Sequence, residues 1–213
     1  MGVAKGAAVA ATPSIKGTVF LALVEDVQKL LAKKAVKREE LGRWLQPKDL
    51  SCVDSAVHAH EWYDIRLYAR LSELLRDVEG KGRNEYLVKR GERSARRLID
   101  GGLYSQLEYL QAASFGRQSD PKERFAAFGR DLARTTTLSA SILNFSKWAA
   151  KPDPAQANRW LMEVSEARDY PETLAWATLG FTNELGRTKR KEDIWTWERP
   201  EPARIVFRMV RDP

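Results

Sequence analysis

Few residues in this chain belong to the types that usually perform chemistry. The 213 residues include two histidines, His58 and His60, and one cysteine, Cys52. Histidines at i and i+2 diverge on a helix and point to opposite sides of a strand, so they are poor partners for a metal ion, and zinc would need two more ligands. No nucleophile elbow, glycine-rich phosphate loop or distinctive pair of carboxylates is present. We therefore expect no metal site, no cofactor and no enzymatic activity, and a buried, structural role for Cys52.

The best candidate for anion binding is the basic stretch at residues 89–97. On a helix, Arg90, Arg93 and Arg97 share a face and Lys89 lies beside them. Such a stripe can bind the phosphates of a nucleic acid or a cyclic nucleotide, because arginine binds phosphate in a bidentate manner. The alternative is a helix side that only faces solvent. The net charge of +7 allows an acidic partner but does not choose its class.

Tryptophan is unusually frequent, with seven residues, most of them in the last third of the chain. Trp195 and Trp197 alternate and so share one face of a strand, and Trp160 is expected opposite them on a neighbouring strand. Together with Trp176 and Phe181 from a helix, they form a candidate pocket for an apolar small molecule. The alternative is that the same rings pack in the core.

The aromatic residues belong to a stretch, residues 139–211, with the pattern of two strands, a helix and two more strands. Trp160, Met162 and Val164 alternate with polar residues, which is typical of a half-buried strand. Pro171 and Glu172 suit the first turn of a helix. The pattern predicts strands at 141–148, 159–165, 193–198 and 203–210 and a helix at 169–185. The apolar face of such a sheet must be covered.

The preceding part of the chain is predicted to be helical and to provide that cover. Apolar residues recur at helical spacing in segments 20–34, 39–45, 61–78, 84–100, 103–113 and 121–132. We therefore expect an α+β protein with a helical N-terminal half packed on a four-stranded antiparallel sheet of ββαββ order. It would form one domain, residues 15–213, with a helical part at 15–134 and a flexible leader at 1–14. No run of about 18 apolar residues occurs, so no membrane insertion is expected.

This order of elements resembles the haem nitric-oxide/oxygen-binding (H-NOX) domains. Those chains also begin with a Lys-Gly-Thr-hydrophobic segment, which matches residues 16–19, and end in a strand like residues 203–210 (ARIVFRMV). A further likeness is to an uncharacterised paralogous family that is abundant in myxobacteria. It rests on Trp62-Tyr63-Asp64 with Tyr68 and Leu71, on Gly91 with Arg93, and on Gly102-Leu103-Tyr104.

The resemblance implies two haem determinants, and this chain lacks both. The iron ligand of the family is a histidine on the helix before the first strand, but residues 121–134 contain none. The propionate motif is Tyr-x-Ser-x-Arg, and the matching place reads Val164-Ser165-Glu166-Ala167-Arg168, without the tyrosine and with a longer Ser-to-Arg spacing. We therefore expect a cytoplasmic, haem-free, non-catalytic sensory or adaptor protein of bacterial signalling. It would bind a protein partner or an apolar small molecule, or alternatively a nucleic acid or cyclic nucleotide through residues 89–97.

Overall fold

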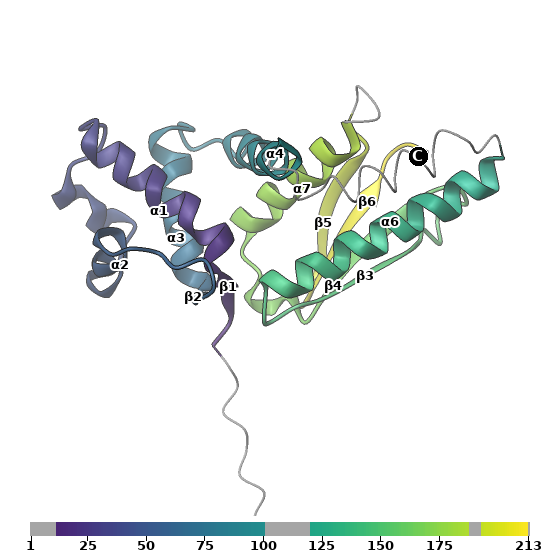
Figure 1. The fold of residues 1–213 in the computed structure, drawn as a ribbon, viewed down its shortest axis with the longest axis horizontal. Coiled ribbons are helices and arrows are strands. Elements are labelled where there is room, and N and C mark those ends of the chain that lie inside the picture. The colour runs from purple at the N-terminus through teal and green to yellow at the C-terminus, as the bar shows by residue number, and fades with distance from the viewer. Residues whose placement is uncertain (1–11, 101–119, 188–192, 213) are drawn as a thin grey trace, which may run out of the picture.

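The computed structural model of the chain describes residues 12–100, 120–187 and 193–212. Figure 1 shows a helical N-terminal part beside a C-terminal sheet that α6 crosses, with α4 and α7 between the two parts. The predicted helix at 103–113 and the leader residues 1–11 lie outside the described residues. The last leader positions are structured, because Pro13 accepts a hydrogen bond from the backbone of Ile65 and Ser14 lies in a strand.

The N-terminal part consists of helices and a small two-stranded sheet. Its elements are β1 (Ser14–Lys16), α1 (Gly17–Ala32), the 3-10 turns Arg38–Arg43 and Pro47–Asp49, α2 (Leu50–Asp54), β2 (Trp62–Asp64), α3 (Ile65–Val78) and α4 (Glu85–Asp100). The antiparallel pair β1–β2 was not predicted, and the helix expected from residue 61 begins at Ile65, where Asp64 caps it by accepting from the Arg66 N–H. Only a glycine fits at the start of α1, since a Cβ on Gly17 would lie 2.0 Å from the carbonyl oxygen of His58.

The C-terminal part confirms the predicted fold class and ββαββ order. It contains α6 (Pro121–Ile142), β3 (Lys147–Pro152), β4 (Trp160–Ser165), the 3-10 turn Ala167–Asp169, α7 (Glu172–Arg187), β5 (Trp195–Glu201) and β6 (Arg204–Met209). The sheet is antiparallel throughout, with the order β3-β4-β6-β5. No helix in the described parts of the chain is long and apolar enough to cross a membrane.

The first predicted strand of the sheet begins later than expected, because α6 continues through its first residues. The prediction placed that strand at 141–148, but α6 ends at Ile142 and β3 begins at Lys147. Threonine and serine disfavour a helix when their hydroxyls form hydrogen bonds with nearby backbone groups in non-helical conformations. In α6 their hydroxyls instead donate to carbonyls three or four residues earlier in the same helix, at Thr135, Thr136, Thr137, Ser139 and Ser141.

The two faces of the sheet differ in character. Its inner face buries Met162, Val164, Ile205 and Phe207 beneath the helices. Its outer face carries ion pairs that cross the strands: Lys151 of β3 and Arg204 of β6 both contact Glu163 of β4, while Arg208 contacts Asp153 and Glu198. The hydrogen bonds from Lys151 and then Arg204 hold the pKa of Glu163 below its usual value.

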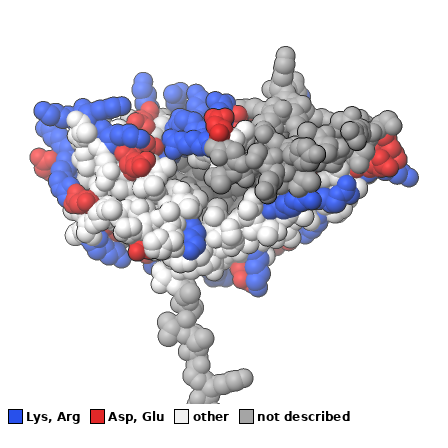
Figure 2. Space-filling view, in the orientation of Figure 1, with Lys and Arg blue, Asp and Glu red and all other residues white. Residues whose placement is uncertain are grey.

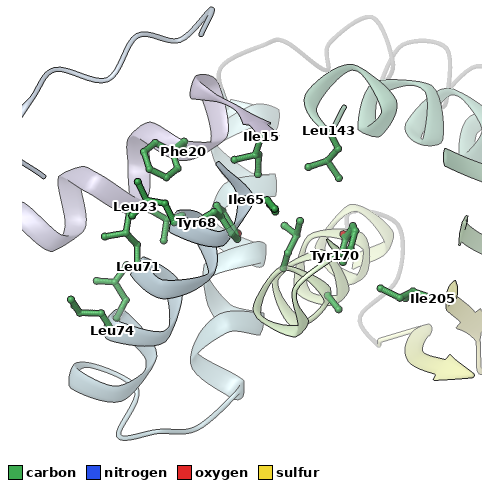
Figure 3. Packing of buried hydrophobic residues seen from close by; sticks show 14 of the residues in the cluster. Ile15, Phe20, Leu23, Ile65, Tyr68, Leu71, Leu74, Leu143, Tyr170 and Ile205 are labelled. Atoms are coloured by element: carbon green, nitrogen blue, oxygen red, sulfur yellow. The ribbon is translucent and has the colours of Figure 1, made fainter. Parts of the chain in front are cut away.

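One continuous core joins the two parts of the chain. Figure 3 shows Phe20, Leu23 and Leu71 between α1 and α3, and Ile15, Leu143 and Tyr170 leading from there to Ile205 of the sheet. Tyr170 is buried, and its hydroxyl hydrogen-bonds Thr178 at 2.8 Å. Burial raises the pKa of this phenol, so it remains a neutral hydrogen-bonding group.

Helices α4 and α7 approach so closely that glycine is required on both. A Cβ on Gly91 would lie 1.8 Å from the carbonyl oxygen of Ala177, and one on Gly180 would lie 1.9 Å from that of Val88. Both contacts are with backbone, which cannot move aside as a side chain can. This crossing attaches α4 to the C-terminal part, and a 2.5 Å ion pair between Arg90 and Asp26 attaches it to α1.

Candidate functional site

Helix α6 packs directly on the sheet through Trp160, one of the predicted pocket residues. The Trp160 indole N–H donates to the carbonyl oxygen of Phe125 at 3.2 Å, and the two rings lie 4.9 Å apart. A Cβ on Gly129 would lie 2.1 Å from the Trp160 ring, so the glycine leaves the space that this ring occupies. The space between this turn of α6 and β4 is therefore filled by the protein's own side chain.

The other tryptophans of the predicted pocket continue this aromatic layer along the sheet. Trp195 is 5% exposed and its ring stacks 6.4 Å from that of Phe128 on α6. Met209 lies between Trp195 and Trp160, because it pairs with Trp195 across the strands and its sulfur accepts from the Trp160 backbone N–H. The sequence prediction omitted Trp148, which stacks on Phe207 with ring centroids 6.1 Å apart.

Trp176 of α7 and Trp197 of β5 meet edge to face, with ring centroids 5.3 Å apart; we call this contact the tryptophan seam. The indole nitrogen of Trp197 is buried and has no hydrogen-bond partner among the described residues. Phe181 does not join the seam, because it lies five residues from Trp176 on α7, about 140° around the helix. Trp176 and Trp197 thus meet at the seam, but Trp160 is not on a strand next to Trp195 and Trp197 as predicted, because β6 separates β4 from β5.

Asn183 fixes the position of β5 against α7. Its amide oxygen accepts from the backbone N–H groups of Ile194 and Trp195 at 3.1 and 2.9 Å, and its amide nitrogen donates to the carbonyl oxygen of Trp195. The side chain is 3% exposed, so all these bonds are shielded from water. These hydrogen bonds fix the start of β5 against α7, and so they position Trp197 opposite Trp176.

The predicted anion-binding residues divide into one buried and three exposed groups. Arg90 is not available to a ligand, because its guanidinium pairs with Asp26 of α1 and only 13% of its side chain is exposed. Burial of Asp26 would raise its pKa, but the hydrogen bonds from Arg90 and Lys29 outweigh this effect and the pKa is lowered. Lys89, Arg93 and Arg97 are exposed.

The two histidines are exposed, and the cysteine is half-buried instead of buried as predicted. His58 and His60 are both exposed in the segment between α2 and β2, with their rings 6.0 Å apart. Within the described ranges, no three His, Cys, Asp or Glu side chains are grouped so as to hold a metal ion. Cys52 is half-buried, and its burial raises the pKa of the thiol, which disfavours the reactive thiolate.

The residues at the haem-motif positions do not converge on a common point. Val164 is buried in the inner face of the sheet, whereas Ser165, its neighbour on the strand, points to the opposite face. Arg168 is exposed. Nearby, Arg199 instead holds the turn after β4 by donating to the carbonyl oxygens of Ala167 and Tyr170.

Comparison with known proteins identifies the fold. No protein-family model matches the chain, and no curated protein matches its sequence. Solved structures do match it. The Fe(II) unliganded H-NOX protein from K. algicida is 13% identical, with a TM-score of 0.54 over 92% of this chain and 95% of that one. A mutant of T. tengcongensis H-NOX is also 13% identical, with a TM-score of 0.52 over 93% and 99% of the two chains.

The arrangement of helices and sheet is therefore an α+β fold, and specifically an H-NOX-like one, as the resemblance implied. The residues of this chain do not fit the haem that the fold implies. Helix α6 has no histidine, and both histidines of the chain lie on the exposed segment before β2. The segment that matches the propionate motif lacks the tyrosine, and its Arg168 is exposed.

Proposed function

We propose that this chain is a haem-independent, non-catalytic sensory or adaptor domain of bacterial signalling. The observation that carries the proposal is the failed fit to haem in a chain with an H-NOX-like fold. A haem iron needs an axial ligand and its propionates need charged or hydroxyl partners. The helix concerned has no histidine, and the segment that matches the propionate motif has no tyrosine and a longer Ser-to-Arg spacing.

The proposed site is the tryptophan seam between α7 and β5, and its occupant is an apolar molecule with a hydrogen-bond acceptor or the side chain of a partner protein. A buried indole N–H without an acceptor costs about 1–3 kcal/mol and is rare in native proteins. The buried Trp197 nitrogen is such a donor. An acceptor brought by a ligand would remove this cost, and the edge-to-face rings would supply the apolar contact.

Binding at the seam would act on signalling through the helix that forms one of its sides. Helix α7 contacts α4 through the glycine crossing, and α4 contacts α1 through Arg90 and Asp26. A ligand shifts such a packing only if it binds one arrangement better than another. The seam, the crossing and the ion pair form one chain of contacts from the sheet to the N-terminal helices.

A hemin titration followed by visible absorption tests haem independence. We expect no saturable one-to-one Soret change in the wild-type protein. The variant His58→Ala/His60→Ala removes every histidine of the chain and is the matched control. A saturable change in the wild type would contradict the proposal, and its loss or retention in the variant would tell whether a histidine is the ligand.

Binding of the fluorescent probe 1-anilinonaphthalene-8-sulfonate tests the seam. Trp197→Phe removes the free N–H and should weaken saturable binding by about 5–10-fold, the value of one hydrogen bond. Trp62→Phe is the matched control, because Trp62 is an exposed tryptophan on β2 and does not belong to the seam. Equal weakening in the two variants would contradict a site at the seam.

A further inference from the structure

Three exposed cations form a row along α4. Lys89, Arg93 and Arg97 lie at i, i+4 and i+8, so neighbours along the row are separated by about 6 Å of helix rise. None of them pairs with a carboxylate in the described residues; Arg93 only lies over the Tyr86 ring, at 5.8 Å. The two basic residues between them on the helix are used elsewhere, since Arg90 pairs with Asp26 and Arg96 with Glu184.

The fold extends this row with cations from two other helix ends. Helices α1 and α3 both begin at the β1–β2 sheet and end on the same side of the molecule, where the turn into α4 lies (Figure 1). Figure 2 shows Lys and Arg side chains gathered along this upper edge, with a few acidic ones among them. The exposed cations here, which we call the basic rim, are Lys33, Lys34, Lys37, Lys81, Arg83, Lys89, Arg93 and Arg97.

The basic rim lacks the apolar anchors that a protein or membrane partner would use. Protein interfaces are centred on buried aromatic or apolar residues, and stable attachment to a membrane surface needs an apolar insertion as well as charge. In the described parts of the chain, the large hydrophobic residues that are exposed are Trp62, Leu138 and Val210. They lie on β2, on α6 and after β6, and none belongs to the rim. A phosphate backbone needs only cations at a regular spacing.

We propose that the basic rim binds the phosphate backbone of a nucleic acid without reading its sequence. The row on α4 would contact successive phosphates, and the lysines at the ends of α1 and α3 would extend the track. The inference uses exposed side chains of α4 and not the rings of the tryptophan seam, so it stands or falls independently of the proposed function.

Fluorescence anisotropy with the whole chain and a labelled oligothymidine of about 20 nucleotides, long enough to span one such surface, tests the proposal. Each phosphate contact on a single strand contributes about 0.7 to the slope of log affinity against log salt. The variant Lys89→Gln/Arg93→Gln/Arg97→Gln should reduce that slope by about 2 and weaken binding roughly 100-fold at 0.1 M salt. Unchanged thermal unfolding would establish that the variant is folded.

A second triple variant, Lys48→Gln/Arg130→Gln/Arg168→Gln, removes the same charge from exposed positions on other surfaces. It should keep most of the affinity and of the salt slope. Equal weakening in the two triple variants would overturn the proposal, because binding would then follow net charge alone. No binding by the wild type at about 50 mM salt would also overturn it. So would binding of phosphatidylglycerol vesicles that depends on the α4 row while oligothymidine does not bind.

Discussion

Replacing Gly180 by alanine tests how closely α4 and α7 are held together. The new Cβ would lie 1.9 Å from the carbonyl oxygen of Val88, whereas real Cβ contacts essentially never fall below 3.0 Å. The two helices would therefore have to move apart by more than 1 Å at the point where they cross. A gap of 0.5–1 Å already forfeits about a quarter to a half of the contact attraction.

The magnitude follows from two opposing effects. Overpacking usually costs about 1–3 kcal/mol and more where only backbone can yield, while alanine in a helix gains about 1 kcal/mol over glycine. We expect Gly180→Ala to lower the free energy of unfolding by about 2 kcal/mol or more. In a chain of this size, 2 kcal/mol corresponds to a fall in Tm of about 4–8 °C.

Urea and thermal unfolding followed by far-UV circular dichroism measure the effect. Gly42→Ala is the matched control, because nothing lies within 4 Å of the position where its Cβ would be. This control should change stability by less than about 0.5 kcal/mol. If Gly180→Ala were as stable as Gly42→Ala, the close crossing of α4 and α7 would be wrong.

Three further predictions concern polar contacts within the fold. Asp26→Asn and Arg90→Gln should each destabilise the protein by about 1–3 kcal/mol, and the double variant should lose less than the sum in urea unfolding; additive losses would contradict a direct ion pair. Asn183→Ala should cost about 2 kcal/mol or more and speed hydrogen exchange where β5 begins, since two backbone N–H groups lose their acceptor. The folded-state pKa of Glu163 lies below its ordinary value of 4.5, so its contribution is present above about pH 4.5 and is lost as pH falls through the folded-state value. Glu163→Gln should therefore flatten the acid side of a Tm-against-pH curve, and an unchanged curve would contradict the strand-crossing pairs.

The order of elements was predictable from the sequence because it depends on local pattern. The alternation of Trp160, Met162 and Val164 marked β4, and Pro171 marked the start of α7. The end of α6 was not predictable in this way. Whether Thr135 or Ser139 breaks a helix depends on where its hydroxyl donates, and in α6 each donates to the backbone of the same helix.

The candidate site was only partly predictable, because its decisive features are contacts between distant segments. Trp160, Trp195 and Trp197 could be assigned to strands by their alternation, but no sequence pattern indicates that the Trp197 N–H lacks an acceptor. Arg90 belonged to a plausible phosphate-binding stripe until the fold placed Asp26, 64 residues earlier, beside it. The glycines at 91 and 180 likewise acquire their role only where two helices cross.

Native mass spectrometry of the protein, purified from cells supplied with a haem precursor, tests haem independence most directly. We expect the mass of the polypeptide alone, or of the polypeptide with a small apolar molecule retained at the tryptophan seam. The first result would favour an adaptor with a protein partner, and the second would identify the class of ligand. A stoichiometric haem adduct, retained through gel filtration, would contradict the account.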